Sequence, residues 1–508
     1  MNELLLLLPS LLAAPSAQDF NGDGYSDLAV GVFGENISGA AASGAVQVLY
    51  GGPSGLGSAG AQFLCQNSAG VRDMAEQNDS FGLALQHGDF DGDGFDDLAV
   101  GSPREAIAGL AEAGLVQVFY GGALGLTTTG QEYLTQKTPG APGALQSMAK
   151  FGAALAAGDV DEDGCDELAI GIPGADWGGA GYVGSVWVLA GSAAGLQPLD
   201  SSKWSRATFG QAAQSGAGFG STLVMADFDG NGHADLAIGA PGTDVGAGSS
   251  AGAVHVVYSS SIVGLTSVGA SFWHQDVPGI DSAPTNIEKF GAALAAGDFD
   301  GNGRDDLAIG VPYDFIAGSA SPGAVHVLYG LPAGLGVADD EYWHEDVPGV
   351  YDVAESQDQF GAALAAGNFD GDAYADLAIG VPGEGSGEFY DLHGAVHVFM
   401  GSVDGLSNFE KSYWTQDDTV QETSEVFDMF GQALAVGDFN DSGYDDLAIG
   451  APGEYLGAYP GTAYAAMGVV HVFYAGIPSA SSDYWHQNVA GIPDLSEHGD
   501  FFGWSLGR

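Results

Sequence analysis

Gly88 to Gly101 read GDFDGDGFDDLAVG, and variants of this stretch return along the whole chain. In this copy Asp89, Asp91, Asp93 and Asp97 occupy positions 1, 3, 5 and 9 of an acidic loop, with Gly94 at position 6. Carboxylates on alternate residues of a tight turn can direct several oxygens at one point, and calcium takes about six to eight oxygen ligands. The stretch predicts a calcium loop, against the alternative of a solvated acidic turn.

The acidic loop starts at seven places, separated by 68 to 71 residues: Asp19, Asp89, Asp159, Asp227, Asp298, Asn368 and Asp438. Each repeat holds a Phe-Gly pair, a small-residue segment, the loop, and three more segments that are rich in Val, Ile, Tyr and Phe. Such short segments, bounded by Gly, Pro, Asn and Asp, are typical of strands. Four antiparallel strands repeated seven times predict an all-β fold, a seven-bladed β-propeller over residues 18–508. An open β-solenoid is the rival, but its repeats are shorter.

The two ends of the chain predict how the ring closes. The first loop lacks a preceding Phe-Gly pair, and the last pair, at Phe502, lacks a loop. In the third repeat FGAALAAGD spans nine residues; the C-terminal FGWSLGR supplies seven, and Gln18-Asp19 completes the count. We therefore expect a C-terminal strand to join the N-terminal blade.

Composition limits the classes of partner and the compartment. With 66 acidic and 10 basic residues the net charge is -56, which argues against nucleic-acid binding. Residues 1–17 contain an apolar run from Leu4 to Ala14, too short to span a bilayer, and we expect a signal peptide and export, although no Lys or Arg precedes the run. No other apolar stretch is long enough for a transmembrane helix. Cys65 and Cys165 lie in different repeats, and we expect free thiols.

The segment FGAALAAGDFDGNGRDDLAIGVP, Phe290 to Pro312, resembles the FG-GAP repeat, which builds the N-terminal β-propeller of integrin α-subunits. The resemblance covers the chain after the predicted signal segment. It implies that loops of the form Asp-x-Asp-x-Asp-Gly-x-x-Asp bind calcium and that the propeller binds extracellular protein partners.

Each loop offers side chains at positions 1, 3, 5 and 9 and a main-chain carbonyl at position 7, so up to seven calcium sites are predicted. The predicted ligands are Asp19, Asn21, Asp23, Tyr25 and Asp27 in loop one; Asp89, Asp91, Asp93, Phe95 and Asp97 in loop two; Asp159, Asp161, Asp163, Cys165 and Glu167 in loop three; Asp227, Asp229, Asn231, His233 and Asp235 in loop four; Asp298, Asp300, Asn302, Arg304 and Asp306 in loop five; Asn368, Asp370, Asp372, Tyr374 and Asp376 in loop six; and Asp438, Asn440, Ser442, Tyr444 and Asp446 in loop seven.

The loops are expected to differ in affinity. Charge count predicts that loops two and three bind most tightly and that loop seven, with two carboxylates, binds most weakly. Loop six has Ala373 where the others have glycine; if its φ is positive, the Cβ costs about 1 kcal/mol.

Recurring histidines and aromatic pairs suggest a metal ring or a sugar platform, but packing explains them better. The histidines occupy one position of the third strand, and blade-equivalent positions are too far apart to share an ion. The residues are His255, His326, His397 and His471. We expect them to be structural, and the Tyr-Trp pairs of the fourth strand to pack between blades.

Strand topology places the acidic hairpins and the variable loops on opposite faces, and binding usually resides in loops held by a rigid scaffold. We expect a secreted or cell-surface calcium-binding propeller acting as an adhesion or ligand-binding module. A protein or glycan partner would bind opposite the calcium loops. The variable-loop residues singled out are Trp177, Tyr313, Phe315, Glu384, Glu388, Phe389, Tyr390, Asp391, Glu454, Tyr455, Tyr459 and Tyr464.

Two alternatives stay open at this point. One is an extracellular glycan lyase or hydrolase on a propeller scaffold, and the other is a structural envelope protein. No catalytic motif stands in a context that would confirm it, so we expect no enzyme. An enzyme would need a non-repeating cluster of acids, His or Arg converging in one pocket, whereas a binding module needs only a broad face.

Overall fold

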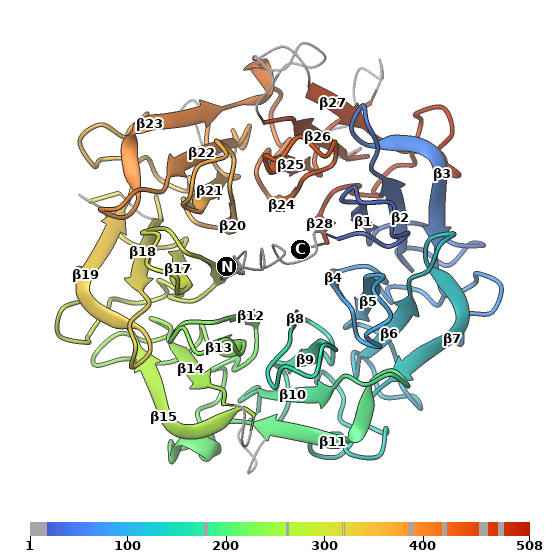
Figure 1. Cartoon of the computed structure of the whole chain (residues 1–508), viewed down its shortest axis with the longest axis horizontal. Helices are drawn as coiled ribbons and strands as arrows, with labels where there is room; N and C mark the ends of the chain where they lie inside the picture. The colour runs from blue at the N-terminus through green and yellow to red at the C-terminus, as the bar shows by residue number, and fades with distance from the viewer. Residues whose placement is uncertain are drawn as a thin grey trace, which may run out of the picture.

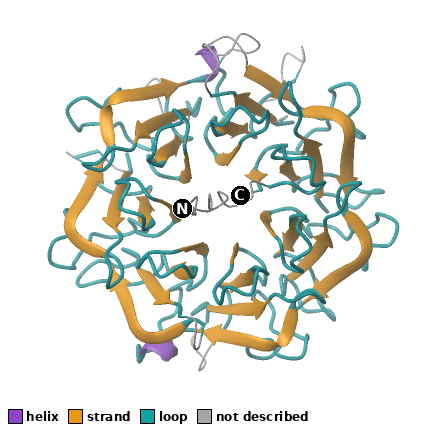
Figure 2. Cartoon of the chain, in the orientation of Figure 1, coloured by secondary structure: helices purple, strands orange, loops and turns teal. Residues whose placement is uncertain are grey.

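The computed structural model describes residues 18–507, apart from 177–180, 261–263, 317, 320, 386–390, 419–423, 457–465 and 476–481. These residues form seven four-stranded antiparallel sheets arranged in a ring, which confirms the predicted propeller (Figure 1). Strands and loops make up nearly all of the described chain (Figure 2). The expected signal peptide, 1–17, lies outside the described residues.

Each blade runs from an innermost strand beside the ring axis to an outermost strand at the rim. Blade one contains β28 (Ser505–Leu506), β1 (Leu28–Val32), β2 (Ala45–Tyr50) and β3 (Gly57–Leu64). Blade two contains β4 (Ala84–Gly88), β5 (Asp97–Ser102), β6 (Leu115–Tyr120) and β7 (Thr127–Leu134). Blade three contains β8 (Leu155–Gly158), β9 (Glu167–Ile172), β10 (Ser185–Ala190) and β11 (Gln197–Trp204). Blade four contains β12 (Thr222–Ala226), β13 (Asp235–Gly239), β14 (Val254–Tyr258) and β15 (Thr266–Trp273).

The last three blades repeat this order. Blade five contains β16 (Ala293–Gly297), β17 (Asp306–Val311), β18 (Ala324–Tyr329) and β19 (Gly336–Trp343). Blade six contains β20 (Ala363–Gly367), β21 (Asp376–Val381), β22 (Ala395–Met400) and β23 (Ser407–Trp414). Blade seven contains β24 (Ala433–Gly437), β25 (Asp446–Ala451), β26 (Val469–Phe473) and β27 (Ser482–Trp485). Short 3-10 helices, η1 (Arg206–Phe209) and η2 (Gln416–Asp418), follow the outer strands of blades three and six.

The C-terminal strand completes the first blade, as the chain ends predicted. Ser505 and Leu506 of β28 pair with Gly31 and Val30 of β1. The Gly507 N–H also donates to the Ala29 carbonyl at 2.8 Å. The first blade is therefore built from both ends of the described chain, which leaves no open edge between blades one and seven.

The core lies between the blades. Second strands such as β5 and β17 are buried at every position, because each blade is covered on both faces by its neighbours. The phenylalanines of the Phe-Gly pairs are fully buried: Phe81, Phe151, Phe219, Phe290, Phe360, Phe430 and Phe502. These rings fill the same position in every blade, which explains why the pair recurs at a fixed offset from the loop.

A tyrosine at the end of the third strand links each of five blades to the next. The Tyr258 hydroxyl accepts a hydrogen bond from the Leu335 N–H at 2.9 Å, and Tyr329 accepts one from Leu406 at 3.2 Å. Equivalent bonds join Leu56 to Tyr474, Leu126 to Tyr50, and Leu196 to Tyr120. A glycine precedes each of these leucines. The Gly-Leu pair that recurs in the repeat therefore lies at the contact between successive blades.

The recurring histidines are structural, as expected. His326 is fully buried and lies between Phe290 of its own blade, 5.5 Å away between ring centroids, and Tyr342 of β19, 4.7 Å away. The tryptophans of the outer strands pack between blades, since Trp343 contacts Phe399 and Trp414 contacts Phe473. The tyrosine of each pair instead faces the histidine of its own blade.

Two further observations concern the whole chain. Cys65 and Cys165 are buried and unpaired. Among the described residues, no helix has the length and apolar character needed to cross a membrane.

Candidate metal centres

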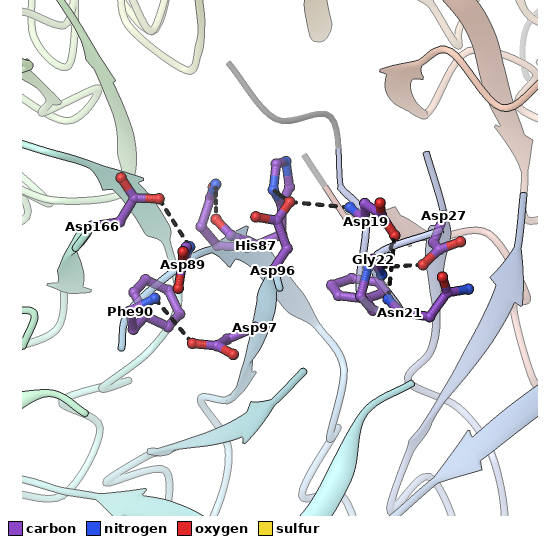
Figure 3. Close-up of polar contacts among 12 residues, drawn as sticks. Asp19, Asn21, Gly22, Asp27, His87, Asp89, Phe90, Asp96, Asp97 and Asp166 are labelled. Carbon is purple, nitrogen blue, oxygen red and sulfur yellow. Dashed lines mark hydrogen bonds and ion pairs between the residues drawn. The ribbon is translucent and has the colours of Figure 1, made fainter. Parts of the chain in front are cut away.

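Six of the seven acidic loops join the innermost strand of a blade to its second strand. The first loop precedes β1, whose innermost neighbour β28 comes from the C-terminus, and all seven loops lie on one face of the ring. In loop two, Asp89 follows β4 and Asp97 is the first residue of β5 (Figure 3). The backbone of the loop turns around the first carboxylate: Asp89 Oδ1 accepts from the Asp93 N–H at 3.1 Å and Oδ2 accepts from the Gly94 N–H at 2.9 Å. Gly94 has φ of 88°, which favours glycine at position 6.

The side chains at positions 1, 3 and 9 converge. In loops two, three and four one carboxylate oxygen from each of the three residues lies within 4.8 Å of the others. The three sets are Asp89, Asp91 and Asp97; Asp159, Asp161 and Glu167; and Asp227, Asp229 and Asp235. Three hard oxygen ligands at this separation fit a calcium ion.

The carboxylate at position 9 is the most buried of the predicted ligands in each loop. Asp97 is 1% exposed; its Oδ2 accepts from the Phe90 N–H at 3.0 Å and its Oδ1 from the Gly121 N–H at 2.8 Å. The equivalent residues accept the same pair of bonds, one from the loop and one from the end of the third strand: Asp27, Glu167, Asp235, Asp306, Asp376 and Asp446. Position 9 therefore ties the loop to the blade.

Burial raises the pKa of every position 9 carboxyl, although the amide N–H bonds oppose the shift. The pKa of Asp97 rises to about 8, as do those of Asp27, Glu167 and Asp306. The pKa values of Asp235 and Asp446 rise to about 7, and that of Asp376 to about 6. A buried carboxylate beside other carboxylates is costly unless a cation accompanies it.

The side chain at position 5 of loop two lies nearer the solvent. Asp93 is exposed, and its Oδ1 accepts from the Phe95 N–H at 3.1 Å. In loops four and five the position 5 amide also bonds the third strand: Asn231 Nδ2 donates to the Ser259 carbonyl at 3.1 Å, and Asn302 Nδ2 to that of Gly330 at 3.3 Å. These contacts orient the side chains, and the carbonyl at position 7 stays a predicted ligand.

Loops six and seven depart from the others. Ala373 does not adopt a positive φ, so the expected Cβ strain does not arise. Loop six bends differently, and Asn368 Nδ2 donates to the Asp372 carbonyl at 2.9 Å. In loop seven both amide atoms of Asn440 are buried without a hydrogen-bond partner among the described residues.

Position 8 has a role that sequence reasoning missed. The Asp96 N–H donates to the Asp19 carbonyl of blade one at 3.0 Å, and Asp96 Oδ2 accepts from the Asp19 N–H at 3.2 Å (Figure 3). The backbone bond recurs at all seven seams, from Asp166 to Asp89, Ala234 to Asp159, Asp305 to Asp227, Ala375 to Asp298, Asp445 to Asn368, and Ser26 to Asp438. Every loop is thus bonded to the next around the whole ring. Position 8 is an aspartate in four of the seven loops, and this recurrence is the sequence signal that could have revealed the role.

On the opposite face, the variable-loop residues divide into exposed and buried groups. Tyr313 and Phe315 are 40% and 55% exposed, whereas Glu384 and Glu454 are buried and do not belong to an exposed surface. The other large exposed apolar residues on this face are Met74, Leu110, Tyr182, Ile287, Tyr351, Val353, Val426, Phe427 and Leu495. Trp177, Glu388, Phe389, Tyr390, Tyr459 and Tyr464 lie outside the described residues.

The innermost strands surround a central cavity of about 400 Å³. Its wall consists of Ala, Leu, Val, Met, Ser and Thr side chains, with Gln86, Gln432 and Trp504. No Asp, Glu, His, Lys or Arg belongs to this wall among the described residues.

The comparisons with known proteins agree with this architecture. The family model for the FG-GAP repeat matches residues 13–49, 81–119, 151–189, 219–257, 290–328, 360–399 and 430–465, more than half of the chain. The chain is 32% identical over 211 residues to the phosphatidylinositol-glycan-specific phospholipase D of Rattus norvegicus, covering 40% of this chain and 24% of the relative. It is 31% identical over 239 residues to integrin alpha-PS2 of Drosophila melanogaster, covering 46% of this chain and 15% of the relative.

These curated relatives are much longer than the matched region, and the chain spans at most about a quarter of their length. A solved rhamnogalacturonan lyase of Bacillus licheniformis aligns with a TM-score of 0.32 and 13% identity, over 69% of this chain and 68% of that one. The TM-score is too low for any argument about function. The seven matched repeats, one in each blade, show that the chain belongs to the FG-GAP repeat family.

Proposed function

We propose that the seven hairpin loops bind calcium and that the calcium-stabilised propeller presents its opposite face to a protein or glycan partner outside the cell. The observation that carries the metal part is the buried carboxylate at position 9, which is held by two amides in every loop and lies, in loops two to four, beside two further carboxylates. Calcium would offset the charge of these groups and tie each loop to its blade.

The inter-loop bonds support a structural role for the metal. Residues at position 1 supply both a proposed ligand and the carbonyl that accepts from position 8 of the next loop. Ordering one loop therefore orders a contact with the next blade. The ions would stabilise the ring itself, which leaves partner recognition to the other face.

The exposed apolar residues support a contact surface on that other face. Most of the large apolar side chains that are exposed belong to loops opposite the calcium hairpins, and aromatic residues are enriched in protein interfaces. The wall of the central cavity lacks ionisable side chains among the described residues, which favours a binding module over a glycan lyase or hydrolase. A structural envelope protein would need no such apolar surface.

Thermal melting with excess calcium and with chelator tests the metal part. We expect a higher melting midpoint with calcium. A free calcium concentration of a hundred times the Kd of one site adds about 2.7 kcal/mol to the free energy of unfolding. Asp91→Asn, at a proposed ligand, should reduce the calcium-dependent shift, whereas Asp96→Asn, at position 8, should leave it nearly unchanged. Coincident midpoints for the parent protein would contradict calcium binding.

Protein and glycan arrays probed in calcium test the partner part. Any binding found should weaken in Phe315→Ala and persist in Leu331→Ala, because both residues are exposed in blade five but lie on opposite faces. Loss of binding only in Leu331→Ala would place the partner on the face that carries the hairpin loops. Turnover of a glycan without stable binding would favour the enzyme.

A further inference from the structure

A second family of acidic clusters lies on the face opposite the hairpin loops, at the seams between blades. Glu105 follows β5, and Asp79 lies in the connection from β3 to β4. Both are 2% exposed. Together with Glu76 they place one carboxylate oxygen each within 4.8 Å of the others. The same arrangement closes the ring, where Glu35 is 3% exposed, Asp500 is fully buried, and Glu497 completes the set.

A glutamine from the preceding blade reaches into each of these two clusters. Gln66 follows β3, and its Nε2 donates to Glu105 Oε2 at 2.7 Å. Gln487 follows β27, and its Nε2 donates to Glu35 Oε2 at 2.7 Å and to Asp494 Oδ2 at 3.2 Å. Both glutamines are 1% exposed, and the Oε1 atom of each is buried with no hydrogen-bond partner in the described part of the chain. The same is true of Asp500 Oδ1.

Within the part of the chain that the structure describes, no ion pair joins a Lys or Arg to Glu35, Asp79, Glu105, Glu497 or Asp500. A buried pair of carboxylates with a neighbouring orphan amide oxygen is the donor set of a hard cation, because carboxylate and amide oxygens are the ligands that calcium takes.

Two of the other five seams supply an internal comparison, whereas the remaining three keep both acids, as Asp314 and Glu288, Glu384 and Asp358, and Glu454 and Asp428. At the seam between blades two and three, Ala149 and Ala175 replace the two acids, and between blades three and four Ala217 and Thr243 replace them. At the latter seam Arg206 stands where the glutamine does, and it donates to Thr243 Oγ1 at 2.9 Å. At both of these seams the two acids are replaced together, which is expected if the two acids bind one ligand.

We propose that the seams between blades seven and one and between blades one and two each bind a divalent cation, with calcium as the best fit. The ligands would be Glu35, Glu497, Asp500 and Gln487 at the first seam, and Glu76, Asp79, Glu105 and Gln66 at the second. These sites are separate from the hairpin loops and join successive blades on the proposed partner face.

Long-wavelength anomalous diffraction from crystals of the full chain grown in calcium tests the proposal directly. We expect peaks between Glu35, Glu497 and Asp500 and between Glu76, Asp79 and Glu105, and none between Ala149 and Ala175. Peaks in the hairpin loops alone would overturn the seam sites and support the hairpin sites. Peaks at the seams alone would support the seam sites and overturn the hairpin sites.

Calcium stoichiometry from equilibrium dialysis gives a second test in solution. The double variant Asp79→Asn, Glu105→Gln keeps the acceptor oxygens and should lose one bound calcium per protein. The control Asp176→Asn, an exposed acid beside Ala175, should lose none. An unchanged stoichiometry in the double variant would overturn the site at that seam. If the double variant does not fold, the diffraction result on the parent protein decides.

Discussion

At the scale of single residues, two kinds of position do different work in the repeat. The acids at position 9 are proposed calcium ligands, and they also hold the hairpin to the third strand, as Asp97 does through the amides of Phe90 and Gly121. The glycines of the Gly-Leu turns are there because the preceding blade's tyrosine occupies the space of a side chain. A Cβ on Gly125 would overlap the Tyr50 hydroxyl.

Gly125→Ala should destabilise the protein more than Gly130→Ala. The two glycines have nearly the same φ, 85° and 84°, so the backbone strain is matched, but a Cβ on Gly130 meets nothing within 4 Å. We expect Gly125→Ala to lower the free energy of unfolding by about 1–3 kcal/mol more, because of overpacking at the seam. Chemical denaturation measures the difference. Equal losses of unfolding free energy in the two variants would show that the contact between Gly125 and Tyr50 does not affect stability.

At the scale of elements, the seam between an outer strand and the next blade contains a half-buried acid in blade five. Glu341 of β19 lies beside Tyr329 and accepts from Trp343 Nε1 at 2.7 Å. Burial raises the pKa of Glu341 from 4.5 to about 7. The folded state therefore holds the proton more tightly than the unfolded state does.

Glu341→Gln should change the pH dependence of stability in a defined direction. The contribution of Glu341 is fully present below about pH 4.5 and is lost as the pH rises through about 7. Relative to the parent, the glutamine variant should therefore gain stability between pH 5 and pH 8. Urea denaturation across this range, with Asp176→Asn as an exposed control, measures it. A difference between variant and parent that does not change with pH would contradict the shift.

At the scale of the whole molecule, the ring depends on one short strand. β28 supplies only two paired residues, yet it carries the neighbouring Phe502, which is fully buried. The hairpin loops are joined into a closed circle of backbone bonds as well, and the bond from Ser26 to Asp438 completes it. Closure is therefore made twice, at the inner strand and at the hairpins.

Removing residues 502–508 should destabilise the propeller by at least roughly 3–5 kcal/mol, the usual cost of losing a buried Phe side chain. Placing the same seven residues directly before Gln18 should recover most of this free energy, because Gly507 lies against Gln18 in the folded chain. Denaturation of the truncated and relocated variants measures both changes. A relocated variant no more stable than the truncated one would show that β28 acts through its connection to blade seven.

The sequence by itself determined the blade number, the strand order, the closure and the loop positions whose carboxylates converge. Each of these follows from local periodicity, since a seven-fold repeat of about 70 residues repeats its turn chemistry as well. Only the tertiary structure decided the roles of position 8, the Gly-Leu turn, and Glu384 and Glu454. These residues act across seams, and the partners that bury or bond them lie in another blade. The Asp96 contact with Asp19 spans 77 residues, a distance that the periodicity of one repeat cannot express.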